Sequence, residues 1–388
     1  MNNTPIYLDN AATTKTDPAV VEAMLPYFTE TYAVASSQFS HTPGIMAREG
    51  LDQARKIIAD RLGASTEEIV FTSGGTESNN LAIKGAWAAH RQKKSHLICS
   101  KIEHNSVLHA CQALEREGAR VTYLDVDGEG FIDIDQLEAA IGGETFLVSV
   151  QHGNQEVGTV QDIARIAALC QAKGVLFHTD ASLTFTKLPL NLREIPADLV
   201  TMSAHKLHGP KGVGALFVRK GTELQKVFHG GYSEFDLRPG TENVAGAVGF
   251  GKAVELATTE QVQAVQRLQE RLFQGFEATV KGLRINGPRD IARRVPGNVN
   301  VSFDRIEGES VVLHMDMKGV AVITGSACFS RSLEPSYVMM AMGFSHERAH
   351  GSIRFTLSRF NTAQEIDRVK DYAKEVVEAL RRISPLSE

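Results

Sequence analysis

Short apolar runs alternate with stretches of helical periodicity along most of this chain. The strand-like runs fall near residues 69–72, 97–100, 120–126, 145–151, 175–179, 198–203 and 214–218. Asp17-Pro18 carries the signal of a helix start, and Gly63 follows an apolar-periodic stretch as a helix end would. This alternation is typical of a layered α/β domain with a largely parallel sheet, which is the fold class that we predict.

A long charged helical stretch, from about 257 to 281, separates these elements from the rest of the chain. Gly282 and Gly287-Pro288 punctuate the sequence after it. A chain of 388 residues exceeds the size at which one hydrophobic core stops growing. We therefore expect a second, smaller α+β domain after this stretch.

Composition and charge narrow the classes of function. With 43% hydrophobic and 22% charged residues the chain is typical of a globular protein, and its net charge of -5 offers no basic stripe for nucleic acid. No apolar run reaches the roughly 18 residues of a membrane span, and no leader-like segment follows Met1. Four cysteines in so long a chain do not suggest a disulfide framework. We expect a cytoplasmic protein that binds neither membranes nor nucleic acid directly.

The sequence does not predict a metal site. Residues 125–136 imitate the opening of an EF-hand loop, but Gln136 stands where that loop needs a bidentate Glu, so we interpret the segment as a polar turn. Cys99, Cys111 and Cys170 lack the spacing of zinc ligands. Cys111 and Cys170 fall on apolar helix faces, which predicts core positions.

Two charged residues follow apolar runs in the α/β region. Asp180 closes the run 175–179 and Lys206 follows the run 199–202, so both are expected at the C-terminal ends of strands, where open sheets bind ligands. A lysine that forms a Schiff base must first lose its proton, and a carboxylate can keep a pyridine nitrogen protonated. Taken alone, Lys206 could equally be a surface lysine and Asp180 a loop carboxylate. Together with a cysteine nucleophile they suggest pyridoxal phosphate chemistry on a sulfur amino acid.

The segment 69–84 predicts an anion site. A strand-like run, the turn Gly74-Gly75-Thr76 and a helical pattern place backbone N–H groups at a helix start, without a Walker sequence. His104, which follows the run 97–100, is a candidate to stack on a cofactor ring, although a lone histidine also suits a cap or a core position.

Cys328 lies in a Gly- and Ser-rich segment, residues 325–332, which suggests a mobile loop. Attack on sulfur requires a thiolate, and Arg331 is close enough in sequence to stabilise one. The alternative is an inert or buried thiol, which is the commoner role of a free cysteine.

In their order, these motifs resemble the pyridoxal phosphate-dependent cysteine desulfurases of iron-sulfur cluster assembly, which are class-V aminotransferases of fold type I. The motifs are Tyr7 to Thr14, Phe71 to Asn80, Glu103-His104, Ser203 to Lys206, Arg238 to Asn243, Gly325 to Cys328 and Ser352 to Phe355. The resemblance implies a large domain, residues 16–259, with a mostly parallel seven-stranded sheet. It also implies a small domain, residues 1–15 and 260–388, that carries the cysteine loop and a carboxylate-binding arginine.

The resemblance implies a role for each site residue. Lys206 is expected to hold pyridoxal 5'-phosphate, Asp180 to pair with its pyridine nitrogen, and His104 to stack on its ring and move protons. Gly75, Thr76, Ser203 and His205 are expected to bind the phosphate, and Thr241 is expected to reach the phosphate of the other subunit of a homodimer. Gln155 is expected to lie beside cofactor and substrate. Asn10 and Arg354 are expected to bind the substrate. Cys328 would take sulfur from L-cysteine as a persulfide, leaving alanine, and pass it to a protein acceptor such as an iron-sulfur scaffold.

Several positions depart from the family's pattern around the substrate pocket. Phe39 stands where an Arg is common, Gln155 replaces an Asn, and Leu183 replaces a Gln that bonds the cofactor's phenolic oxygen; Gly230 to Phe235 also differs. Losing one such bond costs about 0.5 to 1.5 kcal/mol. We expect Phe39 and Leu183 to make the pocket drier and less basic.

Three functional hypotheses remain from the sequence. The first is a cysteine desulfurase. The second is a related lyase for selenocysteine or another β-substituted amino acid, suggested by Phe39, Gln155 and Leu183. The third is a weakly catalytic sulfur-transfer scaffold, against which the full set of catalytic residues argues.

Overall fold

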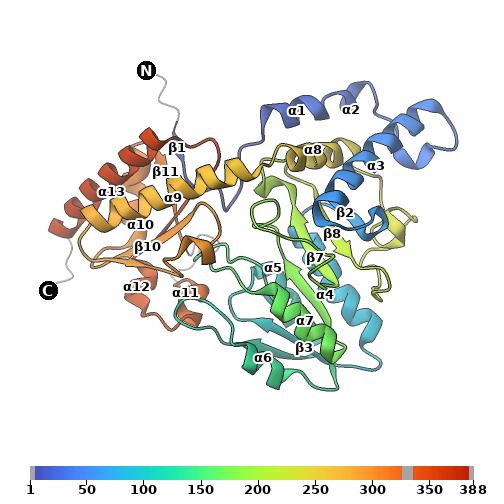
Figure 1. Cartoon of the computed structure of the whole chain (residues 1–388), viewed down its shortest axis with the longest axis horizontal. Coiled ribbons are helices and arrows are strands. Elements are labelled where there is room, and N and C mark those ends of the chain that lie inside the picture. The colour runs from blue at the N-terminus through green and yellow to red at the C-terminus, as the bar shows by residue number, and fades with distance from the viewer. Residues whose placement is uncertain (1–4, 326–334, 384–388) are drawn as a thin grey trace.

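The computed structural model describes residues 5–325 and 335–383, and a seven-stranded sheet forms the centre of its larger part (Figure 1). The strand order is β2-β8-β7-β6-β5-β3-β4. These strands are β2 (Ile69–Thr72), β3 (His96–Ser100), β4 (Arg120–Leu124), β5 (Thr145–Ser149), β6 (Leu176–Asp180), β7 (Leu199–Ser203) and β8 (Gly214–Val218). Of the seven, β8 runs antiparallel to both neighbours and the other pairs are parallel, which confirms the predicted fold class.

Helices cover both faces of this sheet. One face packs against α3 (Thr42–Leu62), α6 (Ile134–Ala140), α7 (Ile163–Lys173) and α8 (Val244–Glu255), and the other against α4 (Gly75–His90) and α5 (Asn105–Arg116). Strand residues alternate between the two cores: Phe71 joins the first and Val70 the second. Because both faces are buried, the central strands read as continuous apolar runs in the sequence. Two short helices, α1 (Pro18–Met24) and α2 (Pro26–Thr29), lie outside α8.

The smaller part has its own sheet and core. Its strands, in the order β12-β13-β10-β9, are β9 (Leu283–Ile285), β10 (Asn298–Phe303), β12 (Ile323–Thr324) and β13 (Ser352–Thr356); beside them β1 (Ile6–Tyr7) pairs with β11 (Val320–Ala321). The helices are α9 (Thr259–Thr279), α10 (Gly308–Met317), α11 (Tyr337–Ala341), α12 (His346–His350) and α13 (Ala363–Ile383). Ile6 and Leu8 pack in this core with Phe276 and Phe355. This packing supports the domain division that we propose, in which residues 16–259 form the large domain and residues 1–15 and 260–388 form the small one.

Several local predictions are confirmed. Asp17 caps α1 by accepting from the N–H of Ala19, and Gly63 ends α3 with a φ of 67°, which a glycine adopts readily. The side chain of Asp127 accepts two backbone N–H groups, so the EF-hand-like segment is a polar turn. Cys111 and Cys170 are buried.

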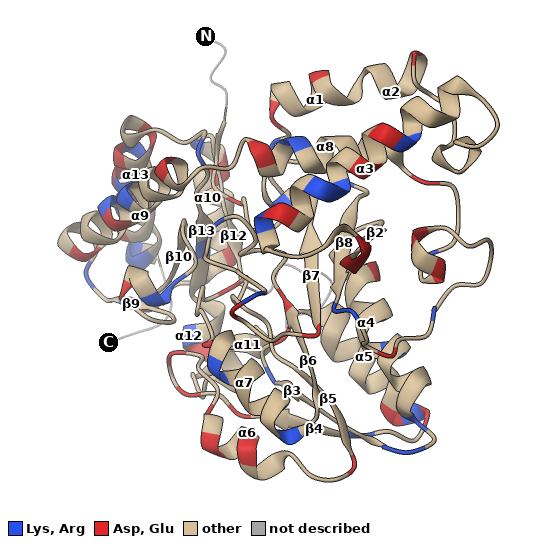
Figure 2. Ribbon diagram, turned by 45° about the vertical axis from the view of Figure 1, so that its right-hand side comes forward, with Lys and Arg blue, Asp and Glu red and all other residues tan. Residues whose placement is uncertain are grey.

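Charges of both signs mix on the outer helices. Figure 2 shows Lys and Arg interspersed with Asp and Glu along α3, α9 and α13. Within residues 5–325 and 335–383, none of the helices combines the length and the hydrophobicity that a membrane crossing requires.

Candidate active site

A cavity of about 470 Å³ lies where the carboxyl ends of the central strands face the smaller part. Asp180 ends β6, and Lys206 lies in a short 3-10 turn, Ala204–Lys206, directly after β7. From the opposite side come Ile323 of β12 and Arg354 of β13. The cavity therefore gathers residues from distant parts of the sequence at one edge of the parallel sheet, where such sheets bind ligands.

Lys206 reaches across the cavity floor to the N-terminal segment. Its Nζ donates a hydrogen bond to the backbone oxygen of Ala11 and another, of 2.7 Å, to that of Ala12. The amine is therefore held at the cavity wall by neutral carbonyls.

Asp180 and His104 belong to one hydrogen-bond network. Asn79 Nδ2 donates to Asp180 Oδ2 at 2.7 Å and to Ser106 Oγ at 2.8 Å, while Ser182 N donates to Asp180 Oδ1 at 2.9 Å. Nδ1 of His104 accepts from the N–H of Ser106, which places the ring proton on Nε2. Burial lowers the pKa of His104, so the imidazole is neutral near pH 7.

One end of the cavity is built for an anion. The helix α4 begins at Gly75, so the first N–H groups of this sixteen-residue helix lack partners within the helix. The hydroxyls of Ser182 and Ser203 are buried without a hydrogen-bond partner among the described residues. A Cβ at position 75 would come within 2.8 Å of Ser182 Oγ, so glycine allows the backbone to approach this closely. We call Gly75, Thr76, Ser182, Ser203 and His205 the anion cup.

His205 completes the cup as a neutral side chain. Its Nδ1 lies 3.1 Å from the hydroxyl of Thr13, and burial lowers its pKa to about 4. The ring adds no charge near neutral pH, but it can donate a hydrogen bond.

Arg354 lies at the other end of the cavity. Its Nη2 pairs with Asp9 at 2.8 Å and its Nη1 donates to the backbone oxygen of Gln155 at 3.1 Å. Its Nε is buried with no partner among the described residues. A guanidinium held in this way can offer its remaining donors to a carboxylate.

Two buried carboxyl groups adjoin these residues, Glu103 and Glu156, and Glu156 itself lines the cavity. Burial raises the pKa of Glu103 to about 8 and that of Glu156 to about 7. Glu103 Oε1 accepts from Ser100 Oγ at 2.5 Å and from the N–H of Gln151 at 2.9 Å, and its Oε2 has no partner in the described part of the chain. Near neutral pH Glu103 is therefore mostly protonated.

Cys328 lies outside the described residues, as does Arg331. On either side of the undescribed segment, Gly325, Ser336 and Tyr337 line the cavity. The described residues on both sides of this segment therefore lie at the cavity.

Three residues that were expected near the site lie outside the lining of this cavity in the single chain. Asn10 does not line this cavity, because its Nδ2 donates to the backbone oxygens of Tyr7 and Thr356. Phe39 is 92% exposed and does not reach the cavity of its own chain, so of these two substitutions only that at Leu183 adds apolar surface there. Thr241 also lies outside this cavity, in the segment 226–243, which we call the strap.

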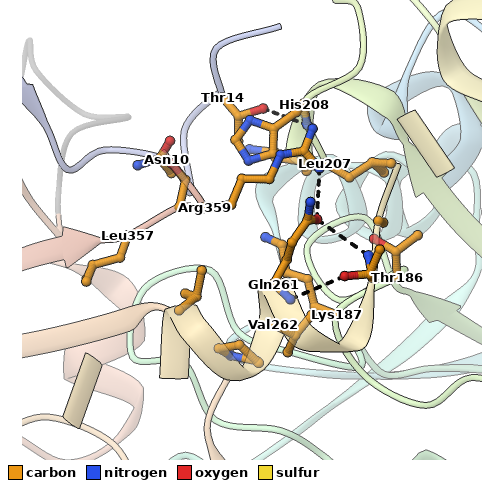
Figure 3. A pocket seen from close by; sticks show the side chains of 16 residues that line it. Asn10, Thr14, Thr186, Lys187, Leu207, His208, Gln261, Val262, Leu357 and Arg359 are labelled. Atoms are coloured by element: carbon orange, nitrogen blue, oxygen red, sulfur yellow. Dashed lines mark hydrogen bonds between the residues drawn. The ribbon is translucent and has the colours of Figure 1, made fainter. Parts of the chain in front are cut away.

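Asn10 instead lines a second cavity, of about 60 Å³ (Figure 3), which Lys206 also lines. Lys187, His208 and Arg359 also face it. Burial and the nearby Lys206 lower the pKa of Lys187 to about 8. Lys206 therefore shares this cavity with the side chains of Lys187, His208 and Arg359, while its Nζ binds the carbonyls of Ala11 and Ala12.

Sequence reasoning missed several residues of the main cavity, namely Asn79, Gln151, Ser182 and Tyr337. Asn79 follows Gly75 by one helical turn, so helical spacing could have placed it beside the cup. Tyr337 donates to the backbone oxygen of Glu103 at 2.6 Å, a contact across 234 positions that no local pattern indicates.

Comparisons with known proteins find similar sequences over nearly the whole chain. A family model described as "Aminotransferase class-V" matches residues 6–369. The chain is 45% identical to "Cysteine desulfurase IscS" of Clostridium botulinum (strain Hall), over all of this chain and 98% of that protein, and 49% identical to the protein of the same name from Anaeromyxobacter sp., over 99% and 95%.

Solved structures agree as well. A "NIFS-LIKE PROTEIN" superposes with a TM-score of 0.90 at 34% identity, over 97% of this chain and 100% of that one. "SspA in complex with cysteine" superposes with a TM-score of 0.82 at 37% identity, over 92% and 100%.

Proposed function

The chain belongs to the class-V aminotransferase family, among its cysteine desulfurases, and from this premise we propose how its residues carry the reaction. L-cysteine and the thiol of Cys328 give L-alanine and a persulfide on Cys328, so the sulfur atom moves from carbon to the protein thiol. The main support for this proposal is that one cavity is lined by Lys206, Asp180 and His104, with the anion cup at one end and Arg354 at the other.

The residues fit pyridoxal 5'-phosphate. The cup supplies unpaired N–H groups and two buried hydroxyls without partners in the described chain, which suit a phosphate. Asp180 suits the pyridine nitrogen, because Asn79 and the N–H of Ser182 hold its carboxylate in place. When bound, the cofactor supplies an electron sink beside the substrate's α-carbon.

The protein groups around that ring bind, orient and move protons. Lys206 provides the amine that holds the cofactor. His104 keeps a proton on Nε2, where it can donate to a substrate atom in the cavity. Arg354 binds the substrate carboxylate with its planar fork, and Gln155 is fixed beside it because its backbone oxygen accepts a hydrogen bond from Arg354 Nη1.

Cys328 is proposed as the sulfur acceptor within the chain. Gly325 and Ser336, at the described ends of its segment, both line the cavity, which supports a thiol that reaches the substrate. A reducing compartment such as the cytoplasm suits a thiol that must stay free. From the persulfide, sulfur would pass to a protein acceptor such as an iron-sulfur scaffold.

We also propose a homodimer. Large apolar side chains are exposed from α1 through α2 to the start of α3: Val21, Leu25, Phe28, Tyr32, Phe39, Ile45 and Met46. Such a patch is typical of an interaction surface. A second subunit there would bring another Thr241 towards the cavity, which suits a residue that does not line the cavity of its own chain.

One observation favours a second candidate, a related lyase with another β-substituted substrate such as selenocysteine. Leu183 lines the cavity with an apolar side chain, 9% exposed, where the family commonly places an amide. That change alters the polarity near the cofactor without removing any of the proposed catalytic groups.

The test is to incubate the cofactor-loaded protein and its Cys328→Ala variant with L-cysteine, and to measure alanine and protein-bound persulfide. Both products from the first protein and neither from the variant would support the proposal. Bound cofactor without alanine from either protein would overturn it. In that case, turnover of selenocysteine by both proteins would support the second candidate, because elimination of selenium does not require the thiol.

A further inference from the structure

Three consecutive residues of the strap adopt a left-handed backbone. Glu234, Phe235 and Asp236 have φ of 48°, 57° and 62°, although none of them is a glycine. This conformation is disfavoured for residues with a Cβ, and it persists where surrounding contacts hold it in place. The strap is otherwise mostly exposed, so the few contacts that it makes must fix its shape.

The first contact is a buried ion pair between the strap and α3. Both oxygens of Glu234 bind Arg55, with two distances of 2.7 Å, and the two side chains are only 5% and 4% exposed. The Arg55 guanidinium lies 4.8 Å from the ring centre of Phe71 and 5.1 Å from that of Phe235. A fork held between two aromatic rings leaves little freedom of orientation.

The same pair binds the backbone of β2, an edge strand of the large sheet. Arg55 Nη1 donates to the backbone oxygen of Ile69 at 2.5 Å, and the N–H of Phe71 donates to Glu234 Oε2 at 2.7 Å. The ion pair therefore fixes the strand that runs directly into the anion cup.

A second contact fixes the other side of the cup. Arg238 Nε donates to Glu77 Oε1 at 2.9 Å, and Glu77 Oε2 accepts from the N–H of Ser73 at 2.8 Å. Glu77 lies in the first turn of α4, so the strap binds the chain on both sides of residues 72–76. Gly75 and Thr76, between the two anchors, line the main cavity.

We propose that the strap, through the Arg55–Glu234 pair and the Arg238–Glu77 pair, positions the anion cup and so sets the affinity for the phosphate end of the cofactor. None of these four side chains lines the main cavity, so they act as positioning residues. The inference rests on the proposed function in one respect, since it takes the ligand of the cup to be the phosphate of pyridoxal 5'-phosphate.

The experiment compares two ligands that differ only in the phosphate. Apoprotein is titrated with pyridoxal 5'-phosphate and with pyridoxal, and the dissociation constants are obtained from the absorbance of the bound chromophore. The variants are Arg238→Gln, which breaks a pair that is 26% and 10% exposed, and the double variant Arg55→Met with Glu234→Met. The double variant removes both partners, because a single removal would leave a buried unpaired charge that can prevent folding.

In both variants we expect the dissociation constant of pyridoxal 5'-phosphate to rise by about tenfold, as for other residues that orient the groups binding a ligand. The constant for pyridoxal should stay at its wild-type value. The control is Arg271→Gln, which breaks a pair of 2.7 Å with Asp367, far from the cup on α9 and α13, and should change neither constant.

Equal weakening of both ligands would overturn the inference, because it would show general loosening of the site. Unchanged binding of both ligands in properly folded variants would also overturn it. A wild-type protein that binds neither ligand would instead overturn the proposed function, so the two failures are distinguishable.

Discussion

Asn79 on α4 donates a hydrogen bond of 2.7 Å to the carboxylate of Asp180 at the end of β6. The same amide nitrogen donates to Ser106 Oγ, which lies 2.7 Å from Nδ1 of His104. One buried amide thus connects the proposed partner of the cofactor nitrogen with the proposed ring-stacking histidine. Networks of this kind fix both the position and the tautomer of the groups that they join.

Replacement of Asn79 by Ala should lower kcat by about tenfold, the usual order for a residue that orients a reacting group. Cofactor binding should persist, because Lys206 and the anion cup are unchanged. Steady-state kinetics on cysteine would measure the effect. The matched control is Asn80→Ala on the same helix, whose amide donates to the backbone oxygen of Thr76 and should matter little. Equal losses in the two variants would contradict a specific role of Asn79.

Arg354→Lys should weaken the binding of the substrate carboxylate. Lysine cannot present two parallel donors, and the loss of a charged hydrogen bond costs about 1.5 to 3 kcal/mol. We expect KM for cysteine to rise by roughly 10- to 100-fold, with a smaller change in kcat. Arg284→Lys is the control, since its pair with Asp304 is exposed on β9. A fall in kcat with an unchanged KM would place Arg354 in the chemistry rather than in substrate binding.

Much of the site could be predicted because its residues follow local patterns. Asp180 and Lys206 come directly after apolar runs, and parallel strands end at one edge of a sheet, so the sequence alone brings these two together. Gly75 is equally local, since a strand, a glycine turn and a helix start are all contiguous.

Contacts between distant segments could not be predicted in this way. The pair of Arg55 with Glu234 spans 179 positions, and no periodicity relates them. The place of Asn10 could not be predicted for a similar reason: its amide binds the backbone of Thr356, 346 positions away, beside the main cavity rather than in its lining. Phe39 was placed at the pocket on resemblance alone, and its exposure in the single chain suits the proposed subunit interface better.

Phe28→Asp should convert the proposed dimer into a monomer. Phe28 is 60% exposed on α2, within the apolar patch, and a carboxylate in a buried interface would be left without a partner. Light scattering would measure the mass, and absorbance would measure cofactor retention, which should fall because Thr241 of a second subunit is lost. Met317→Asp is the control, since Met317 is 83% exposed on α10, outside the patch. A dimeric Phe28→Asp protein would contradict this interface.

Glu103→Gln should make the protein more stable at high pH. Burial raises the pKa of Glu103 from its ordinary 4.5 to about 8, so unfolding releases a proton between these values and becomes easier as the pH rises. Glutamine mimics the protonated acid and still accepts from Ser100 and Gln151. The free energy of unfolding of the variant, relative to that of the wild type, should therefore increase with pH by at most about 1.4 kcal/mol per unit.

Urea unfolding of both proteins at intervals across this pH window would measure the difference. Glu138→Gln is the control, because Lys173 lowers the pKa of this exposed carboxyl and removes any reason for the same trend. A constant difference between the Glu103 variant and the wild type would mean that Glu103 is ionised in the folded protein at every pH tested. The ion would then need a counter-charge, and the raised pKa would be wrong.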